Sequence, residues 1–299
     1  MAILIADKQT PSLPQRKELD EENKMNSWVL ITGATGGLGK AFASECAARG
    51  WNLVLTDLRS APLEALSGGL QKAYGVDIRC YTSDLTNPAS RGQLFDTFTG
   101  ERMRFWMVIN VAGLDFEGSF YEQPFEKIRT IIRLNIEGTL EVTHALMQQR
   151  DPVRTFRIIN VASLAAFYPM PVKATYAASK RFLLDFSLAL REELREVGVT
   201  VTALCPAGMP TTPECIESIE AQGLMGKWTT QNTGSVAAGT IDSALKGKAV
   251  YIPGTLNRIL QALGGVVPAP LIAWIVGERW RLAHERKNAR RRLVAATQS

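Results

Sequence analysis

Seven short, largely apolar segments recur between residues 28 and 253, separated by stretches with a helical pattern. They are rich in β-branched residues and alternate little between apolar and polar, which is typical of strands buried on both faces of a sheet. This order predicts an α/β protein with one doubly wound domain, in which helices cover both faces of a seven-stranded parallel sheet. We predict strands at WVLITG (28–33), NLVLTD (52–57), DIRCYT (77–82), FWMVIN (105–110), RIINVAS (157–163), VTVTALC (199–205) and KAVYIP (248–253). The clearest helical patterns cover 38–49, 88–99, 124–148 and 176–197.

The predicted strands delimit a single domain at 27–255, and 299 residues are enough to give such a domain a large core. Residues 1–26 then form an N-terminal extension, and residues 256–299 form a helical C-terminal extension. A segment at 208–232 follows the sixth predicted strand and carries many apolar residues, so we expect it to act as a lid.

The positive charge of the chain is concentrated in one place. The formal net charge is +5, but six Arg and one Lys stand against one acid, Glu285, between Arg279 and Arg292. The rest of the chain is therefore close to neutral. A single basic tail differs from the basic groove of a nucleic-acid-binding protein, so we expect no nucleic-acid partner. We interpret the tail as the solvated face of a helix.

The four cysteines, Cys46, Cys80, Cys205 and Cys215, show no CxxC spacing, and the chain has only two histidines. We therefore expect neither a metal site nor a disulfide framework, which fits a reducing compartment. The first residues lack the basic region and apolar core of a secretory signal, so we expect a cytoplasmic protein.

Residues 259–277 form an uncharged run of nineteen residues, which raises the question of a membrane span. A spanning helix needs about 20 mostly apolar residues. Here Gly264, Gly265, Pro268 and Pro270 divide the run into two short helices. We expect no stable membrane insertion and place these helices near the substrate entrance or at a subunit contact. Association with a membrane surface is the alternative.

The segment ITGATGGLGKAF (31–42) joins the first predicted strand to its helix. Gly33, Gly37 and Gly39 permit a tight turn and let phosphates approach the backbone N–H groups at the start of that helix. A glycine loop with a strand before it and a helix after it has the context of a dinucleotide-binding, or Rossmann, motif.

Asp57 ends the second predicted strand, about 20 residues beyond the glycine loop, where an acid can bind both adenosine ribose hydroxyls. Such a carboxylate would repel a 2′-phosphate, so we predict NAD(H) rather than NADP(H) as the cofactor. Leu58 stands where a phosphate-binding Arg would be expected, although Arg59 keeps NADP(H) as an alternative. The structural alternative for Asp57 is a helix or turn cap.

The segment TYAASK (175–180) puts Tyr176 one helical turn before Lys180, so both side chains share one helix face. A free tyrosine loses its proton near pH ~10. A neighbouring positive charge favours the phenolate and would lower that pKa toward neutrality. The pair is a candidate acid–base device, although this spacing also arises by chance.

Six motifs in order resemble those of the short-chain dehydrogenase/reductase family, over residues 28–255. Val111 stands where the family has Asn, Ala207 stands where Gly is usual, and Ser163 precedes Tyr176 by thirteen residues, as in the family. The matching segments are TGATGGLG (32–39), SDL (83–85), NVAG (110–113), LNIEGT (134–139), VAS (161–163) with YAASK (176–180), and CPAGMPT (205–211).

The resemblance implies a hydride transfer between nicotinamide C4 and a carbonyl or carbinol carbon. It implies that Tyr176 is the acid/base, that Ser163 binds the substrate oxygen, and that Lys180 binds the nicotinamide ribose. Asn135 would hold a water that links Lys180 to solvent. The structural alternatives are a backbone hydrogen bond for Ser163 and a pinned helix bend for Asn135. The implied cofactor-binding residues are Gly33, Thr35, Gly36, Gly37, Leu38, Gly39, Asp57, Asp84, Leu85, Asn110, Ala112, Gly113, Tyr176, Lys180, Pro206, Gly208 and Thr211.

The segments expected beside the substrate are apolar. They are LAAFYPMPVKAT (164–175) and the stretch 208–230, which contains Met209, Ile216, Ile219, Leu224, Met225 and Trp228. Such a lining suits a large apolar substrate such as a steroid, unless these residues pack on the lid's own base or on another subunit. Within the family, the chain most resembles bacterial hydroxysteroid dehydrogenases, with the 20β position as the specific candidate.

Two other functions stay open at this stage. One is a reductase of acyl-chain or other lipophilic ketones, and the other is a catalytically silent dinucleotide-binding sensor. Family analogy also implies a homo-oligomer, either a dimer or a tetramer.

Overall fold

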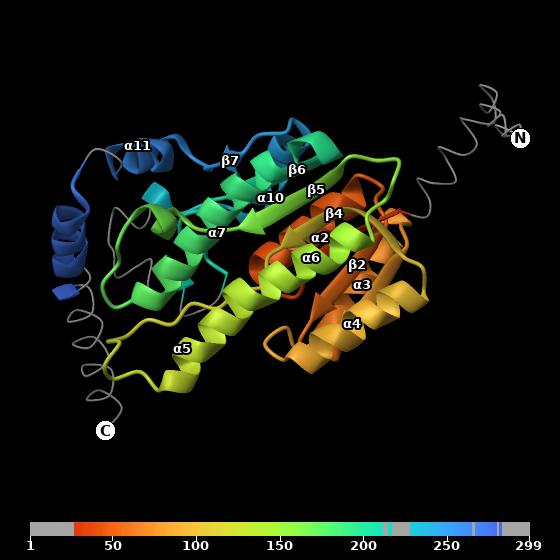
Figure 1. Cartoon of the computed structure of the whole chain (residues 1–299), viewed down its shortest axis with the longest axis horizontal. Coiled ribbons are helices and arrows are strands. Elements are labelled where there is room, and N and C mark those ends of the chain that lie inside the picture. The colour runs from red at the N-terminus through yellow and green to blue at the C-terminus, as the bar shows by residue number, and fades with distance from the viewer. Residues whose placement is uncertain (1–26, 212–214, 217–227, 265–266, 280, 283–299) are drawn as a thin grey trace, which may run out of the picture.

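The computed structural model describes residues 27–211, 215–216, 228–264, 267–279 and 281–282 (Figure 1). The expected N-terminal extension at 1–26, most of the expected lid and the chain beyond residue 282 lie outside the described residues.

The seven predicted strands form one sheet, with every pairing parallel and the order β3-β2-β1-β4-β5-β6-β7. The doubly wound α/β fold is therefore confirmed. The strands are β1 (Ser27–Thr32), β2 (Leu53–Asp57), β3 (Ile78–Thr82), β4 (Arg104–Asn110), β5 (Phe156–Val161), β6 (Val199–Leu204) and β7 (Val250–Tyr251).

Helices lie on both faces of the sheet, as Figure 1 shows. The core on one face is closed by α2 (Gly37–Ala48), α3 (Ser60–Tyr74) and α10 (Thr233–Leu245). The core on the other face is closed by α4 (Pro88–Gly100), α6 (Thr139–Gln148) and α7 (Ala174–Glu193). Short helical segments complete the description: α5 (Phe125–Ile132), the π-helix Arg133–Gly138, the 3₁₀ helices Leu164–Phe167 and Arg195–Val197, and α11 (Thr255–Gly264).

The core contains several aromatic side chains that solvent does not reach. Phe42, Phe98, Phe105 and Phe156 are 0% exposed. Complete burial of one such side chain stabilises the fold by about 1.5–3 kcal/mol. The apolar strands predicted from the sequence therefore supply the interior of both layers.

Two sequence signals explain how α4 begins and how it is attached. The Asn87 side chain accepts hydrogen bonds from the N–H groups of Ala89 and Ser90, and proline follows it at the first helical position. Arg91, within the first turn, is fully buried and donates two hydrogen bonds to Glu141 on α6, at 2.5 and 2.6 Å. A third bond, of 2.6 Å, goes to the carbonyl oxygen of Leu85. One guanidinium thus joins α4 to α6.

Three element boundaries differ from the prediction. The helix predicted at 124–148 is divided by the π-helix Arg133–Gly138 into α5 and α6. The seventh strand has two residues instead of six, because only Val250 and Tyr251 pair with β6. The fifth strand ends at Val161, which leaves Ser163 beyond the sheet.

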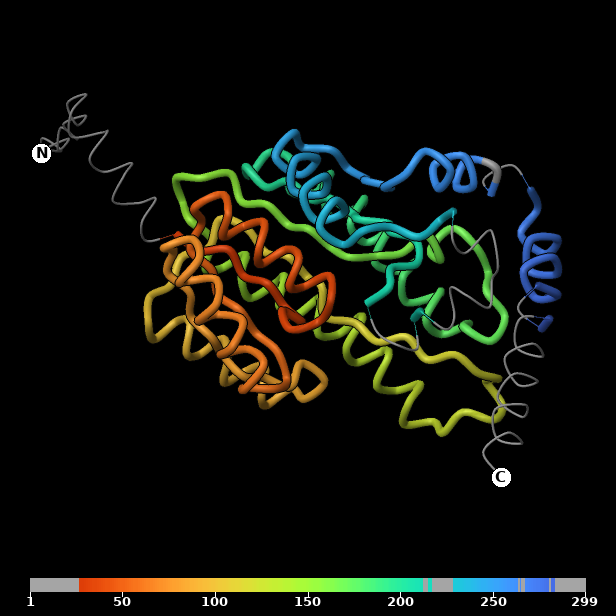
Figure 2. The backbone as a smooth tube through the Cα atoms, turned by 180° about the vertical axis from the view of Figure 1, so that it is seen from behind, coloured from red at the N-terminus to blue at the C-terminus, as the bar shows by residue number. Residues whose placement is uncertain are grey.

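Two helical segments at the C-terminal end pack on the chain that follows β5. These are α11 and residues 269–279, drawn in blue at one end of the molecule (Figure 2). A side chain at Gly264 would lie 2.4 Å from Tyr168 Cε1, and one at Gly277 would lie 3.1 Å from Pro171 Cγ. The predicted division into two short helices agrees with these elements, and they lie against the segment expected to contact substrate.

Candidate active site

The sequence motifs gather at the carboxyl ends of the central strands. The strand order reverses between β1 and β4, so the connections that leave these two strands diverge and open a crevice. The glycine loop follows β1, the segment 110–113 ends and follows β4, and Ser163 follows β5.

Two glycines of the loop are required by the packing of the chain itself. Gly33 has a φ of +64°, and a side chain there would lie 2.8 Å from the Cα of Ala112. A side chain at Gly39 would lie 2.1 Å from the carbonyl oxygen of Gly33. These glycines let β1, the NVAG segment and α2 approach one another closely.

Gly37 has a different neighbour, from the segment that follows β6. A side chain at Gly37 would lie 2.6 Å from Thr211 Cγ2, so the fold brings two predicted cofactor residues into contact. At Gly36 the one described neighbour that an added Cβ would meet is the Gly33 carbonyl, at 3.4 Å. Among the described residues no side chain caps the start of α2, and its first N–H groups, at Gly37, Leu38 and Gly39, can meet an anion.

Asp57 lies beside the glycine loop at the end of β2. Its Oδ2 accepts a hydrogen bond from the N–H of Thr35 (2.9 Å), and its Oδ1 accepts one from the N–H of Leu58 (2.8 Å). The carboxylate therefore caps the turn, which is the structural alternative, and is also held where an adenosine ribose would lie against the loop.

The segment NVAG is fixed mainly through its backbone. Thr32 Oγ1 accepts hydrogen bonds from the N–H groups of Val111 and Ala112, at 3.1 and 3.2 Å. The side chain of Asn110 is turned into the core, where it donates to Thr143 Oγ1 and Asn160 Oδ1. Val111 packs against the core, so its difference from the family's Asn leaves the backbone contacts intact.

The remaining predicted cofactor residues line the same end of the sheet. Asp84 Oδ1 accepts hydrogen bonds from the N–H and hydroxyl of Thr86, and Leu85 is buried. The carbonyl oxygen of Pro206 accepts from the N–H of Leu164 (2.8 Å), and that of Gly208 accepts from the N–H of Gln231 (3.2 Å).

Ser163 and Tyr176 meet although they come from different elements. Ser163 precedes the 3₁₀ helix Leu164–Phe167, and its Oγ accepts a hydrogen bond from the N–H of Ala165 (3.1 Å). Tyr176 lies in the first turn of α7, and a hydrogen bond with the Ser163 side chain lowers its pKa. A hydroxyl that accepts from the backbone can still donate its own proton. Ser163 can thus act as a donor toward an oxygen near Tyr176.

The pKa of Tyr176 moves in the direction opposite to the prediction. Desolvation, the largest cause, raises it above the ordinary value, and the charge of Asp115 raises it further. Lys180 Nζ lies 5.8 Å from the centre of the Tyr176 ring and is not among the causes of the shift. The prediction that Lys180 lowers this pKa is therefore wrong for the protein alone, because burial dominates.

Lys180 is held firmly and is itself perturbed. It is 4% exposed, and its Nζ donates a hydrogen bond to the carbonyl oxygen of Val161 (2.8 Å). Burial lowers the pKa of Lys180 to about 8, although the charges of Asp115 and Cys205 act in the opposite direction. An amine with such a pKa exchanges protons readily near neutrality.

Asn135 lies in the π-helix Arg133–Gly138 and is fully buried. Its Oδ1 accepts from the N–H of Leu114 (2.8 Å), and its Nδ2 donates to the Leu114 carbonyl and to Ser179 Oγ, both at 3.0 Å. A side chain at Gly113 would lie 3.2 Å from both Asn135 Oδ1 and Lys180 Nζ. Asn135 therefore joins the β4–α5 loop to α7 beside the Lys180 ammonium.

Two further residues at this site were missed from the sequence. Lys173 Nζ lies 2.5 Å from Asp115 Oδ2, 3.7 Å from Glu117 Oε2 and 5.9 Å from the centre of the Tyr176 ring. Asp115 lies two residues after the NVAG segment (110–113), but it belongs to no motif. The pairing joins residues 58 positions apart, so only the fold reveals it.

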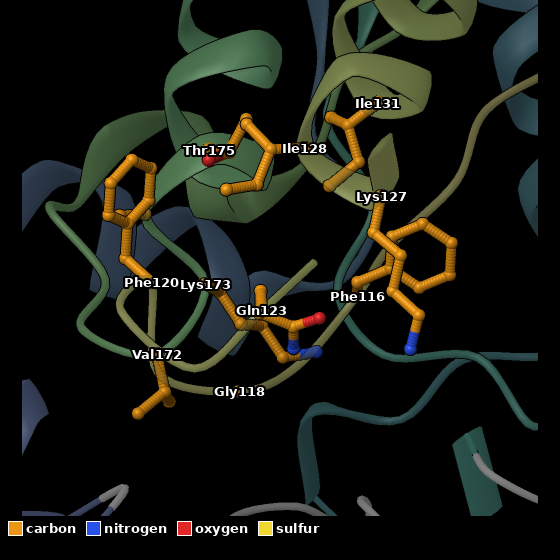
Figure 3. A pocket seen from close by; sticks show the side chains of 11 residues that line it. Phe116, Gly118, Phe120, Gln123, Lys127, Ile128, Ile131, Val172, Lys173 and Thr175 are labelled. Carbon is orange, nitrogen blue, oxygen red and sulfur yellow. The ribbon is translucent and has the colours of Figure 1, made fainter. Parts of the chain in front are cut away.

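A small, mainly apolar pocket adjoins the site (Figure 3). Residues of the β4–α5 loop, α5 and the start of α7 line it, including Thr175, the residue before Tyr176. Part of the expected substrate segment 164–175 thus lines a pocket, and α5 contributes Ile128 and Ile131, which were not predicted. Of the expected lid residues, Met209 packs against the core and Trp228 is 68% exposed, whereas Ile219, Leu224 and Met225 lie outside the described residues.

Within the described residues, no three His, Cys, Asp or Glu side chains are grouped closely enough to bind a metal ion. No helix in the same part of the chain has both the length and the apolar character needed to cross a bilayer.

Residues 27–219 match the short chain dehydrogenase family. Among curated proteins, the 7beta-hydroxysteroid dehydrogenase of Collinsella aerofaciens is 31% identical over 196 residues, which are 66% of this chain and 73% of that protein. The very-long-chain 3-oxoacyl-CoA reductase of Coprinopsis cinerea is 31% identical over 182 residues, which are 60% of this chain and 53% of that protein. The human 17-beta-hydroxysteroid dehydrogenase type 3 is 28% identical over 189 residues, which are 62% and 60% of the two chains.

The curated 3-oxoacyl-CoA reductases are longer proteins, and the matched part spans about half of their length. Solved structures align more fully. A short-chain dehydrogenase from Sphingobium yanoikuyae in complex with NADPH aligns with a TM-score of 0.66 at 26% identity, over 81% of this chain and 96% of that one. One from Burkholderia phymatum in complex with NAD aligns with a TM-score of 0.70 at 21% identity, over 80% and 92%, and shows the fold alone.

Proposed function

The chain belongs to the short-chain dehydrogenase family, and from this premise we propose that it interconverts a ketone and a secondary alcohol on a lipophilic substrate, with NAD(H) as the cofactor. We further propose that the substrate is a hydroxysteroid. One observation carries the reaction class: the Ser163 side chain lies close enough to Tyr176 to lower the pKa of its phenol, and Lys180 lies beside that ring, at the carboxyl ends of the sheet.

The residues around the glycine loop fit a dinucleotide. The first N–H groups of α2 would bind the pyrophosphate, Asp57 would bind the adenosine ribose, and Lys180 would bind the nicotinamide ribose. When bound, the nicotinamide cofactor supplies or accepts the hydride. Asp57 supports NAD(H), because its carboxylate would repel a 2′-phosphate; the NADPH complex of a relative keeps the other cofactor as the alternative.

The proton chemistry follows from the side chains of the protein. Because desolvation raises the pKa of Tyr176, its phenol is protonated at neutral pH and is ready to donate to a carbonyl oxygen. Ser163 would donate a hydrogen bond to the same oxygen and orient it. The resting protein is therefore prepared for ketone reduction. In the oxidative direction Tyr176 must first lose its proton, which positive charge placed beside it would favour.

Lys180 can return the proton to Tyr176 indirectly. An ammonium has three N–H donors, and the described residues hold one of them at the Val161 carbonyl. We propose that another binds the ribose hydroxyls and that exchange through Lys180 connects the site to water. The Asn135 side chain, bonded to Leu114 and Ser179, supports this by fixing the loop beside Lys180 rather than by binding the substrate.

Two substrate classes are supported by different relatives. Relatives named 7beta- and 17-beta-hydroxysteroid dehydrogenase support a steroid, without fixing its position, so the 20β position suggested by the sequence remains one of those to be tested. Relatives named very-long-chain 3-oxoacyl-CoA reductase support a 3-oxoacyl chain as the second candidate. The apolar pocket beside Thr175 suits either.

The decisive experiment follows NADH consumption with ketosteroids bearing the carbonyl at different positions and with long 3-oxoacyl thioesters, with NADPH in parallel. We expect turnover of a ketosteroid with NADH, a loss of about 10²–10⁴-fold in Tyr176→Phe, and retained NADH binding. Tyr74→Phe, on the exposed part of α3, is the matched control. Turnover of thioesters alone would select the second substrate class. NADH binding without turnover of any ketone would indicate a silent sensor.

A further inference from the structure

The helix at residues 269–279 has one buried face and one exposed face, and both faces are apolar. On one face Ile272 is 8% exposed, and Gly277 packs against Pro171. The other face shows Leu271, Trp274 and Ile275 to solvent, at 48%, 65% and 42% exposure. Residues spaced i, i+3 and i+4 form one stripe on a helix, so these three side chains are neighbours.

This arrangement differs from that of an ordinary surface helix, whose outward face is polar. Leu282, 50% exposed, follows Leu271 at a spacing that continues the same stripe. The acid within the stripe, Glu278, forms an ion pair with Arg281 and so adds little net charge. Among the described residues, the outward stripe is therefore apolar apart from this ion pair.

Positive charge borders the stripe. Arg279, at the end of the helix, is exposed. The sequence continues with a strongly basic composition, since six Arg and one Lys lie between residues 279 and 292. Near an anionic bilayer, each Lys or Arg adds electrostatic attraction.

The size of the stripe argues against a second copy of the chain as its partner. A stable protein interface uses about 20–30 residues on each side, whereas this stripe consists of one face of a short helix. An exposed tryptophan among aliphatic residues, bordered by arginines, is instead the pattern of helices that lie in the interface of a membrane.

We propose that the helix at residues 269–279 docks this protein on the surface of an anionic lipid bilayer, with Leu271, Trp274 and Ile275 inserted among the acyl chains near the headgroups. The helix is too short to span, so the association is peripheral. Its inner face contacts Pro171 through Gly277, and α11 contacts Tyr168 through Gly264. Docking thus places the segment 164–175, beside the candidate active site, close to the lipid from which an apolar molecule could enter.

The test is co-sedimentation of the full chain with phosphatidylcholine vesicles, with and without phosphatidylserine. We expect binding to the mixed vesicles, weak binding to phosphatidylcholine alone, and a decrease at high salt. Trp274→Glu is expected to lower the partition coefficient on mixed vesicles roughly tenfold or more. Val153→Glu changes a side chain of similar exposure (62%) just before β5, at the opposite end of the sheet, and should leave binding unchanged.

A second measurement separates insertion from simple charge attraction. Brominated phosphatidylcholine should quench the tryptophan fluorescence of the bound protein, and Trp274→Phe should reduce this quenching while binding persists. Thermal melting and NADH binding verify that each variant is folded. The proposal is overturned if the chain ignores anionic vesicles or if Trp274→Glu binds them as the parent does. It is also overturned if that change dissociates an oligomer instead. None of these readouts depends on turnover, so a failed substrate assignment leaves the test intact.

Discussion

The ammonium of Lys180 donates a hydrogen bond to the carbonyl oxygen of Val161, the last residue of β5, at 2.8 Å. This bond fastens the first turns of α7 to the strand end that leads into Ser163. A buried charge thus helps to hold the helix that carries Tyr176 against the strand that leads to Ser163. That charge has an energetic cost, which can be measured.

Lys180→Met should change how stability depends on pH. The folded-state pKa of Lys180 is lowered to about 8, whereas an amine in the unfolded chain keeps its proton up to about pH 10.4. Between these values the unfolded chain binds more protons, so the free energy of unfolding rises with pH. In urea titrations of the protein without cofactor, we expect the parent to gain about 1–3 kcal/mol over the variant across this window.

Tyrosines and cysteines also titrate in this pH range, but they are the same in the parent and in Lys180→Met. The difference between the two unfolding free energies therefore removes their contribution. Lys72→Met, on the exposed side of α3, is the matched control and should follow the parent at every pH. Parallel curves for the parent and Lys180→Met would contradict the assignment of a lowered pKa to this amine.

Asp115→Asn should move the pH dependence of alcohol oxidation. The charge of Asp115 raises the pKa of Tyr176, so its removal should shift the rise in kcat/KM toward lower pH. Lys173→Gln is the opposing variant, because it leaves Asp115 without the ammonium that lies 2.5 Å away and should shift the same rise toward higher pH. Shifts in the same direction would show that both changes merely loosen the loop.

Gly37→Ala should weaken dinucleotide binding, because the new methyl group would lie 2.6 Å from Thr211 Cγ2. Overpacking of this kind costs about 1–3 kcal/mol, and if that cost falls on the cofactor-bound state the NADH dissociation constant rises roughly 5- to 150-fold. Thr211→Gly in the same chain removes the clash and should restore part of the affinity. Gly68→Ala, on α3 where no described atom lies within 4 Å of an added Cβ, should leave binding unchanged and stabilise the fold by about 0.5–1 kcal/mol.

Asp57→Ala should change the preference between cofactors. Removal of the carboxylate takes away both a ribose partner and a repulsive charge, so NADH should bind more weakly and NADPH relatively better. We expect the ratio of their kcat/KM values to move toward NADPH by about tenfold or more. Asp77→Asn, at the amino end of β3, removes one negative charge far from the site and serves as the control. An unchanged ratio would show that Asp57 is only a turn cap.

Arg91→Ala should be among the more destabilising single changes in the helical layers. The guanidinium is fully buried and holds both Glu141 and the Leu85 carbonyl, so its loss should cost about 2–4 kcal/mol. Arg181→Ala removes an exposed ion pair with Asp185 and should cost less than about 0.5 kcal/mol. Equal effects on the urea midpoint would argue against a special role for Arg91.

The sequence predicted those parts of the fold that local pattern determines. Strands buried on both faces are apolar throughout, so all seven could be located. The glycine loop, with a strand before it and a helix after it, indicated where a dinucleotide would bind. Features that depend on the packing of distant segments could not be predicted from the sequence. Asp115 and Lys173 meet only because the β4–α5 loop crosses the start of α7. The raised pKa of Tyr176 arises from burial, which residue spacing does not report.

The π-helix Arg133–Gly138 adds an extra residue within what would otherwise be one continuous helix. Removal of one residue there would straighten the rod but turn α6 by about 100° relative to α5. Asn135 could then keep its hydrogen bond to Leu114 only if Val142 and Leu146 moved away from the sheet. If those two side chains stayed in the core, Asn135 would lose that bond. Among homologous sequences, insertions and deletions should therefore avoid this hexapeptide even where its side chains vary.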